Sequence, residues 1–198
     1  MKLSDFYTSI RIFLAPFFFI LFFLPSLIGF GADVSVYILI PLFIFMEFTD
    51  FLDGYYARKH KQVSDFGKLF DPFADVLANM TVMFAFVLSG YMPSFLFLLV
   101  LYREMGMTFV RMLASRQGVA IGARKGGKAK TVLYIVAVGF SLALESASRL
   151  GLSLSGYEGV ARGINTALYC LAVIASLGSF IDYLVHFASL LRKATDEK

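Results

Sequence analysis

Long apolar stretches separated by short polar segments dominate this chain. A helix needs about 20 apolar residues to cross a bilayer. We expect six such helices, at about residues 12–30, 34–59, 67–90, 95–102 with a charged continuation, 131–144 and 164–191. Residues 1–11 mix charged with apolar side chains, which predicts a short amphipathic segment lying on the membrane before the first span. The pattern predicts an all-α, polytopic integral membrane protein with a single domain, 1–198.

Composition supports a membrane protein. Of 198 residues, 59% are hydrophobic and 16% are charged, and the mean hydropathy is +0.76, which leaves too little polar surface for a soluble globule. Basic residues concentrate at 58–68, at 116–130 and near both termini. By the positive-inside rule, we expect a cell (inner) membrane protein with both termini cytoplasmic. The net charge of +4 is modest and predicts no nucleic-acid partner, and the single cysteine, Cys170, excludes an internal disulfide.

Four carboxylates, those of Asp50, Asp53, Asp71 and Asp75, stand between apolar stretches. Charges near a bilayer persist where pairing, metal or water compensates them. At about 100° per residue, Asp50 and Asp53 share one helix face, and Asp71 and Asp75, four residues apart, share another. Two facing helices would bring these carboxylates together, and their oxygens suit a hard divalent ion such as Mg²⁺ or Mn²⁺.

Small and basic residues accompany the first pair of carboxylates on its helix face. Gly54 and Ala57 let a ligand approach the backbone, and Arg58 offers a fork of donors suited to phosphate. The residues alone therefore predict a metal-assisted phosphate site at the cytoplasmic edge of the membrane. A cation transporter is the alternative from another class, but it predicts acids distributed along a path and has no use for Arg58.

The spacing of these residues resembles a family signature. The pattern Asp-x2-Asp-Gly-x2-Ala-Arg-x8-Gly-x3-Asp-x3-Asp is similar to that of the CDP-alcohol phosphotransferase family. Every signature position is filled, by Asp50, Asp53, Gly54, Ala57, Arg58, Gly67, Asp71 and Asp75. The resemblance implies an enzyme in which an alcohol attacks the β-phosphorus of CDP-diacylglycerol and releases CMP.

The resemblance also implies a role for each residue of the signature. Asp50, Asp53 and Asp71 would hold a divalent cation, and Asp75 would bind a second ion, act as the base toward the acceptor hydroxyl, or both. Gly54, Ala57 and Gly67 would let the nucleotide lie close to the backbone. Arg58 and Ser64 would contact phosphates, although Ser64 could instead cap the following helix.

A second segment resembles the branch of this family whose members make phosphatidylglycerophosphate from glycerol 3-phosphate. Its residues are Arg103-Glu104, Arg111, Gly118 and Gly127-Lys128-Ala129-Lys130-Thr131, with Tyr134 where that pattern usually has Gln. The resemblance implies that Arg111, Lys128 and Lys130 bind the acceptor, a small phosphorylated alcohol. Inositol phosphate or serine is the alternative acceptor.

The amino-terminal residues carry a partial match to the same branch. Thr8-x2-Arg11 is similar to part of its first motif, with Asp5 in place of an Asn. Arg11 is therefore either an anchor at the level of the lipid headgroups or a substrate contact. The bilayer is an expected partner, and a homodimer is compatible with the resemblance.

Overall fold

The computed structural model describes residues 3–29, 31–60, 65–116, 125–152 and 156–188, with side chains described for 8–29, 31–49, 70–116, 129–152 and 156–188. In this part of the chain there are six helices and no strand. The helices are α1 (Leu3–Ile28), α2 (Ala32–His60), α3 (Asp65–Leu88), α4 (Ser94–Arg116), α5 (Lys125–Arg149) and α6 (Glu158–His186). The prediction of an all-α fold is therefore confirmed.

Five of these helices, α1, α2, α3, α5 and α6, are long and apolar enough to cross a membrane. This finding confirms the prediction of a polytopic membrane protein. Among the described helices, α4 falls outside this group because Arg103, Glu104 and Arg111 interrupt its apolar sequence. Arg103 and Glu104 are buried inside the bundle, where protein groups rather than lipid surround their charges.

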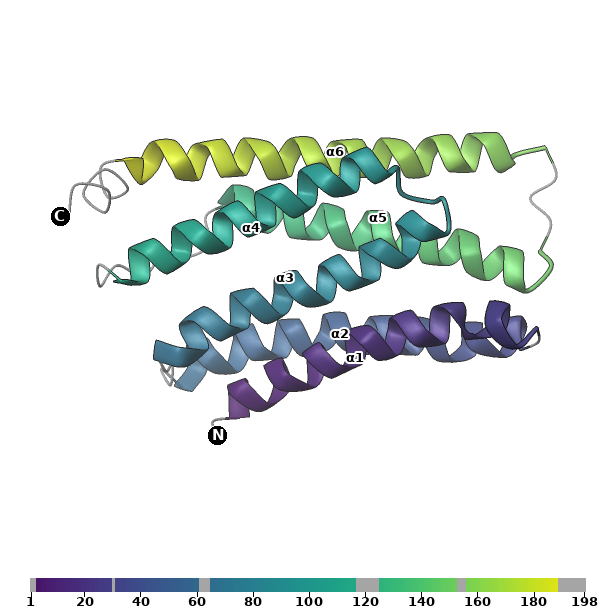
Figure 1. Ribbon diagram of the computed structural model, residues 1–198, viewed down its shortest axis with the longest axis horizontal. Coiled ribbons are helices and arrows are strands. Elements are labelled where there is room, and N and C mark those ends of the chain that lie inside the picture. The colour runs from purple at the N-terminus through teal and green to yellow at the C-terminus, as the bar shows by residue number, and fades with distance from the viewer. Residues whose placement is uncertain (1–2, 30, 61–64, 117–124, 153–155, 189–198) are drawn as a thin grey trace.

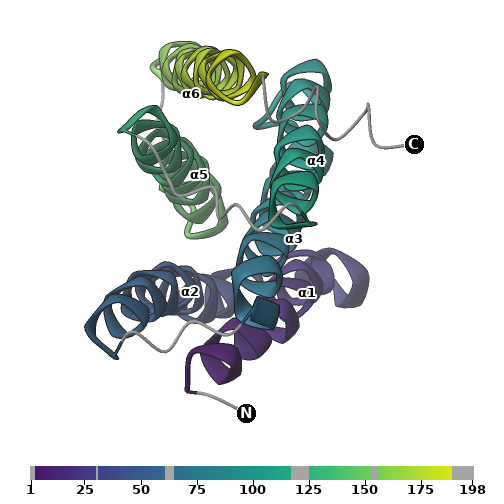
Figure 2. The ribbon, with the colours of Figure 1, turned by 90° about the vertical axis from the view of Figure 1, so that its left-hand side faces the viewer.

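The helices lie roughly along one direction and form two groups (Figure 1). α1 packs on α2 and α3, α4 packs on α3 and α6, and α5 packs on α6. Seen from one end, α3 lies between the α1–α2 pair and α4 (Figure 2). We call the end that holds the starts of α1, α3 and α5 the proximal end, and the opposite end the distal end (Figure 1).

The first helix differs from its prediction. α1 is continuous from Leu3 to Ile28, so the expected amphipathic segment at 1–11 is not a separate element on the membrane surface. Thr8 and Arg11 are buried, at 1% and 5% exposure. Thr8 and Arg11 pack into the bundle because α3 offers them polar partners.

An aromatic cluster links α1 to the turn between α3 and α4. The ring of Phe86 packs edge-on against Phe22, with centroids 5.3 Å apart, and against Tyr91, with centroids 6.3 Å apart. Gly90 follows α3 with φ +76°, and the amide of Tyr91 donates to the carbonyl of Phe86 at 2.9 Å. This left-handed residue ends the helix and turns the chain into α4, as glycine does at many helix ends.

Arg149 joins three helices at the distal end. Its guanidinium donates to Glu145 at 2.7 Å, to the hydroxyl of Ser35 at 2.7 Å and to the carbonyl of Phe22 at 2.8 Å. It also lies over the ring of Phe22, 4.6 Å from the centroid. This side chain therefore holds α5 against α1 and α2.

Replacing Arg149 with Gln should destabilise the protein without changing its activity. The glutamine cannot reach both α1 and α2, and each lost hydrogen bond contributes about 1 kcal/mol. We expect a lower midpoint of thermal unfolding in detergent. The control is Arg162→Gln, since Arg162 is exposed and lies over the Tyr91 ring. Equal midpoints for the two variants would contradict this role of Arg149.

Candidate active site

Two polar side chains of α1 bind two carboxylates of α3 at the proximal end. The hydroxyl of Thr8 donates to Asp71 Oδ1 at 2.7 Å, and the guanidinium of Arg11 forms an ion pair with Asp75. The spacing explains both contacts, since residues three or four apart share a helix face. Arg11 therefore lies inside the bundle against Asp75, and its interpretation as a headgroup-level anchor is wrong.

Asp75 of α3 contacts α1 through Arg11 and also lines a cavity. Its side chain is 39% exposed, although its partner Arg11 is almost fully buried. A carboxylate that is partly exposed can accept a proton or bind a cation. Asp71 and Asp75 thus provide hard oxygen donors of the kind that Mg²⁺ or Mn²⁺ prefers.

The first half of the signature lies at the same end. Asp50, Asp53, Gly54, Ala57 and Arg58 lie on the last three turns of α2, and Gly67 lies in the first turn of α3. Both segments reach the proximal end (Figure 1). Their side chains, and Ser64 as a whole, lie outside the described residues.

The convergence of all four aspartates therefore stays a prediction. No group of three or more metal-binding side chains occurs among the described residues, which include Asp71 and Asp75 but neither Asp50 nor Asp53. The donor types that are described, two carboxylates one helical turn apart, fit the predicted ion.

A cavity of about 190 Å³ lies beside Asp75, between α3, α4, α5 and α6. Its polar lining combines two carboxylates and three cations with several neutral groups. The lining residues are Asp75, Val76, Asn79, Met80, Arg103, Glu104, Arg111, Lys130, Thr131, Tyr134, Ile135 and Tyr183. The carboxylate of α3 therefore shares one cavity with the basic residues of α4 and α5. These basic residues can attract an anionic ligand.

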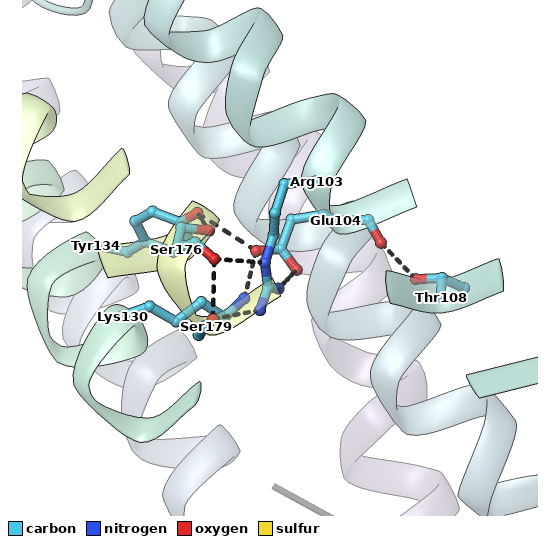
Figure 3. A network of polar contacts seen from close by, with 7 residues as sticks. All are labelled: Arg103, Glu104, Thr108, Lys130, Tyr134, Ser176 and Ser179. Atoms are coloured by element: carbon cyan, nitrogen blue, oxygen red, sulfur yellow. Dashed lines mark hydrogen bonds and ion pairs between the residues drawn. The ribbon is translucent and has the colours of Figure 1, made fainter. Parts of the chain in front are cut away.

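The three cations of this cavity differ in what else they bind. Arg103 donates to the carbonyl of Ser176 at 3.2 Å, to the hydroxyl of Ser179 at 2.9 Å and to Glu104 at 2.8 Å. Lys130 forms an ion pair with the other oxygen of Glu104. Figure 3 shows how these side chains from α4, α5 and α6 meet. The guanidinium of Arg103 thus uses its hydrogen bonds on groups of the protein itself.

Arg111 also has donor capacity left for a ligand. Its Nε is buried and has no hydrogen-bond partner among the described residues. A buried donor without a partner costs free energy, and a ligand phosphate would remove that cost. Arg111 and Lys130 line the same cavity, so the structure brings together two of the three predicted acceptor residues. The side chain of Lys128 lies outside the described residues.

Several residues of this region were missed or assigned no role from the sequence. Tyr134 stands where the resembled pattern has Gln, and its hydroxyl donates to Ser176 at 2.6 Å and lies 3.4 Å from Glu104. Gly106 lets α4 approach α6, because a Cβ there would lie 2.9 Å from the ring of Phe180. Glu104 belongs to the second segment that resembles the family branch, but the sequence alone assigned it no role.

A second cavity, of about 290 Å³, lies at the distal end. Tyr91, Ser148, Glu158 and Arg162 contribute to its lining. Burial and the neighbouring Glu145 carboxylate raise the pKa of Tyr91 to about 12, so this phenol stays neutral at physiological pH. The distal cavity contains none of the signature residues.

Comparison with known proteins identifies the class. The family described as CDP-alcohol phosphatidyltransferase matches residues 1–185. The chain therefore belongs to the CDP-alcohol phosphatidyltransferase family and is a transferase, as the signature predicted. Membership in this family overturns the alternative of a cation transporter.

The relatives carry one recurring name. The chain is 44% identical over 201 residues to the CDP-diacylglycerol--glycerol-3-phosphate 3-phosphatidyltransferase of Treponema pallidum, an alignment that covers 98% of this chain and 92% of the relative. It is 32% identical over 203 residues to the protein of the same name from Mycoplasma genitalium, covering 96% and 86%. A third relative of that name, from Bacillus subtilis, is 37% identical over 97 residues, covering 49% and 50%.

Replacing Thr8 with Val should weaken the site without unfolding the protein. Valine keeps the shape of threonine but cannot donate to Asp71, and a hydrogen bond to a charged group contributes about 1.5–3 kcal/mol. We expect turnover to fall by roughly tenfold or more, with a weaker apparent affinity for Mn²⁺ in the same assay.

The matched control is Thr81→Val. The hydroxyl of Thr81 donates to the carbonyl of Leu77 within α3, at 2.8 Å, and contacts no carboxylate of the site. Its variant should keep the turnover and Mn²⁺ affinity of the natural protein. Unchanged Mn²⁺ affinity and turnover in Thr8→Val would show that this contact does not orient Asp71.

Proposed function

We propose that this protein transfers the phosphatidyl group of CDP-diacylglycerol to glycerol 3-phosphate, giving phosphatidylglycerophosphate and CMP. One observation supports this function above the others: Asp75 shares a cavity with Arg111 and Lys130. A signature carboxylate and two cations suited to a phosphate monoester therefore lie within reach of one small molecule. The names of the relatives point to the same reaction.

The donor half of the site would use the signature residues. Asp50, Asp53, Asp71 and Asp75 would hold the divalent cation, which offsets the negative charge of the diphosphate and of the departing CMP when it is bound. Arg58 and Ser64 would contact phosphates, and Gly54, Ala57 and Gly67 would admit the nucleotide close to the helix backbones. The lipid chains would stay in the bilayer while the diphosphate lies at the proximal end.

The acceptor half would use the opposite wall of the cavity. Arg111, Lys130 and Lys128 would bind the phosphate of glycerol 3-phosphate, and Asp75 would accept the proton of the attacking hydroxyl. The oxygen of that hydroxyl forms a bond to the β-phosphorus, and the bond from this phosphorus to the oxygen of CMP breaks. The ion pair with Arg11 restricts the Asp75 carboxylate, which also lines the cavity.

The proximal end would face the cytoplasm of the cell. The loops with the highest density of basic residues, at 58–68 and 116–130, join helices at this end, and cytoplasmic loops carry such an excess. A soluble acceptor would then enter from the cytoplasm. The inner membrane as the location and the homodimer stay predictions.

The direct test is CMP release by the purified protein in detergent, with CDP-diacylglycerol and Mg²⁺ or Mn²⁺. We expect release with glycerol 3-phosphate and little with serine, inositol phosphate or no acceptor. Removing the metal with a chelator should stop release, and returning the metal should restore it. Release with serine or inositol phosphate instead would overturn the proposed acceptor.

Two variants connect this activity to the site. Asp75→Asn should lower turnover at least a hundredfold, because a carboxamide can neither accept the proton nor bind the metal as a carboxylate does. Binding of CDP-diacylglycerol should remain. Asp33→Asn, at an exposed position in the first turn of α2, is the control and should keep full activity. Natural turnover in Asp75→Asn would disprove the role of this carboxylate.

Arg111→Gln should raise the KM for glycerol 3-phosphate by about tenfold or more, because it removes one of the three charges proposed to bind the phosphate. The KM for CDP-diacylglycerol should change by less than about twofold. Arg116→Gln, which removes an exposed charge from the last turn of the same helix, is the control. Equal increases in both KM values, or equal effects of the two variants, would favour a general surface-charge effect.

A further inference from the structure

Glu104 joins two of the three cations in the cavity. Its Oε2 accepts from Arg103 at 2.8 Å, and its Oε1 accepts from Lys130. The carboxylate is 6% exposed, so both contacts are shielded from water. We propose that Glu104 is a positioning residue, which holds the ammonium of Lys130 where it meets the phosphate of the acceptor. This inference rests on the proposed acceptor site.

Arg103 restricts the movement of the Glu104 side chain. Its three hydrogen bonds engage the Glu104 carboxylate and two groups of α6, the carbonyl of Ser176 and the hydroxyl of Ser179. Arg103 is 3% exposed and lies 6.0 Å from the centroid of the Phe180 ring. A guanidinium with its donors fixed by a neighbouring helix leaves the bound carboxylate little freedom to move. One oxygen of Glu104 therefore points steadily toward α5.

The position of the Lys130 ammonium depends on this oxygen of Glu104. Among the described residues, Glu104 is its hydrogen-bond partner, and its ammonium lies 5.2 Å from the centroid of the Tyr134 ring. An ammonium has three donors, so one bond to Glu104 leaves two for a phosphate. A lysine side chain is long and flexible, and the contact with Glu104 restricts it to the cavity wall. A glutamate plays the same part for the phosphate-binding lysine of protein kinases.

Two simpler roles for Glu104 make different predictions. If Glu104 only neutralised Arg103, the pair within α4 would be enough, and the contact with Lys130, 26 residues away, would have no effect on the acceptor. If Glu104 competed with the phosphate for Lys130, its removal would tighten acceptor binding. Positioning predicts that removal weakens acceptor binding, so the sign of the effect separates the three roles.

The test is Glu104→Gln, measured by steady-state kinetics and by calorimetric titration with glycerol 3-phosphate alone. We expect the KM and the Kd for glycerol 3-phosphate to rise about tenfold, while kcat and the KM for CDP-diacylglycerol change by less than about twofold. Glu104→Asp keeps the charge but cannot reach both cations, so its Kd should lie between those of the natural protein and Glu104→Gln. This second variant answers the question if Glu104→Gln fails to fold.

Glu145→Gln is the matched control for stability. Glu145 also forms an ion pair inside the bundle, with Arg149 at 2.7 Å, but at the distal end. Its variant should lose thermal stability and keep the natural Kd for glycerol 3-phosphate. A loss of stability alone in Glu104→Gln, with an unchanged or tighter Kd, would overturn the positioning role.

A double variant tests whether Glu104 acts through Lys130. Lys130→Gln should weaken acceptor binding, and adding Glu104→Gln should weaken it little further, because the residue to be positioned is already gone. Effects that multiply would contradict the proposal. Calorimetric titration also separates this inference from the proposed function. If the natural protein binds glycerol 3-phosphate but releases no CMP, the proposed reaction is disproved. The Kd values of the same variants would still decide whether Glu104 positions Lys130.

Discussion

The ion pair between Arg11 and Asp75 is the contact on which the arrangement of the site depends. Arg11 is almost fully buried in the bundle, where a charge has to be paired, and Asp75 of α3 supplies its counter-charge. Thr8 and Asp71 form a second contact one helical turn away. Together these contacts fix the position of α1 along α3. Asp75, which is 39% exposed, also lines the cavity.

The cavity then brings charges of opposite sign together. Asp75 of α3 lines it with the three cations of α4 and α5, and Glu104 of α4 binds two of these cations. A reaction between a diphosphate and a phosphate monoester has to bring two anions together, and separate cationic partners reduce their repulsion. α6 acts mainly through groups that hold Arg103 and Tyr134 in place. The distal end, held by Arg149, adds stability away from the chemistry.

The sequence predicted the helices and singled out Asp75, Arg111 and Lys130, which line one cavity, but it did not predict the contacts between distant segments. Hydropathy was sufficient for five of the six expected spans, α4 being the exception, because the exposed faces of the helices must stay apolar. It could not distinguish an amphipathic segment on the membrane from the polar start of α1, since both show the same spacing of polar residues. The partners of Glu104 on α5 and of Arg103 on α6 lie 26 and more than 70 residues away. Such pairs follow from packing and leave no local pattern.

The most direct measurement is an experimental structure with Mn²⁺, CMP and glycerol 3-phosphate bound, with the metal located by its anomalous scattering. We expect Mn²⁺ coordinated by the carboxylates of Asp71 and Asp75 together with those of α2. We also expect the acceptor phosphate between Arg111 and Lys130, inside the cavity that Asp75 lines. A metal bound away from Asp71 and Asp75, or a phosphate bound outside this cavity, would contradict the proposed site.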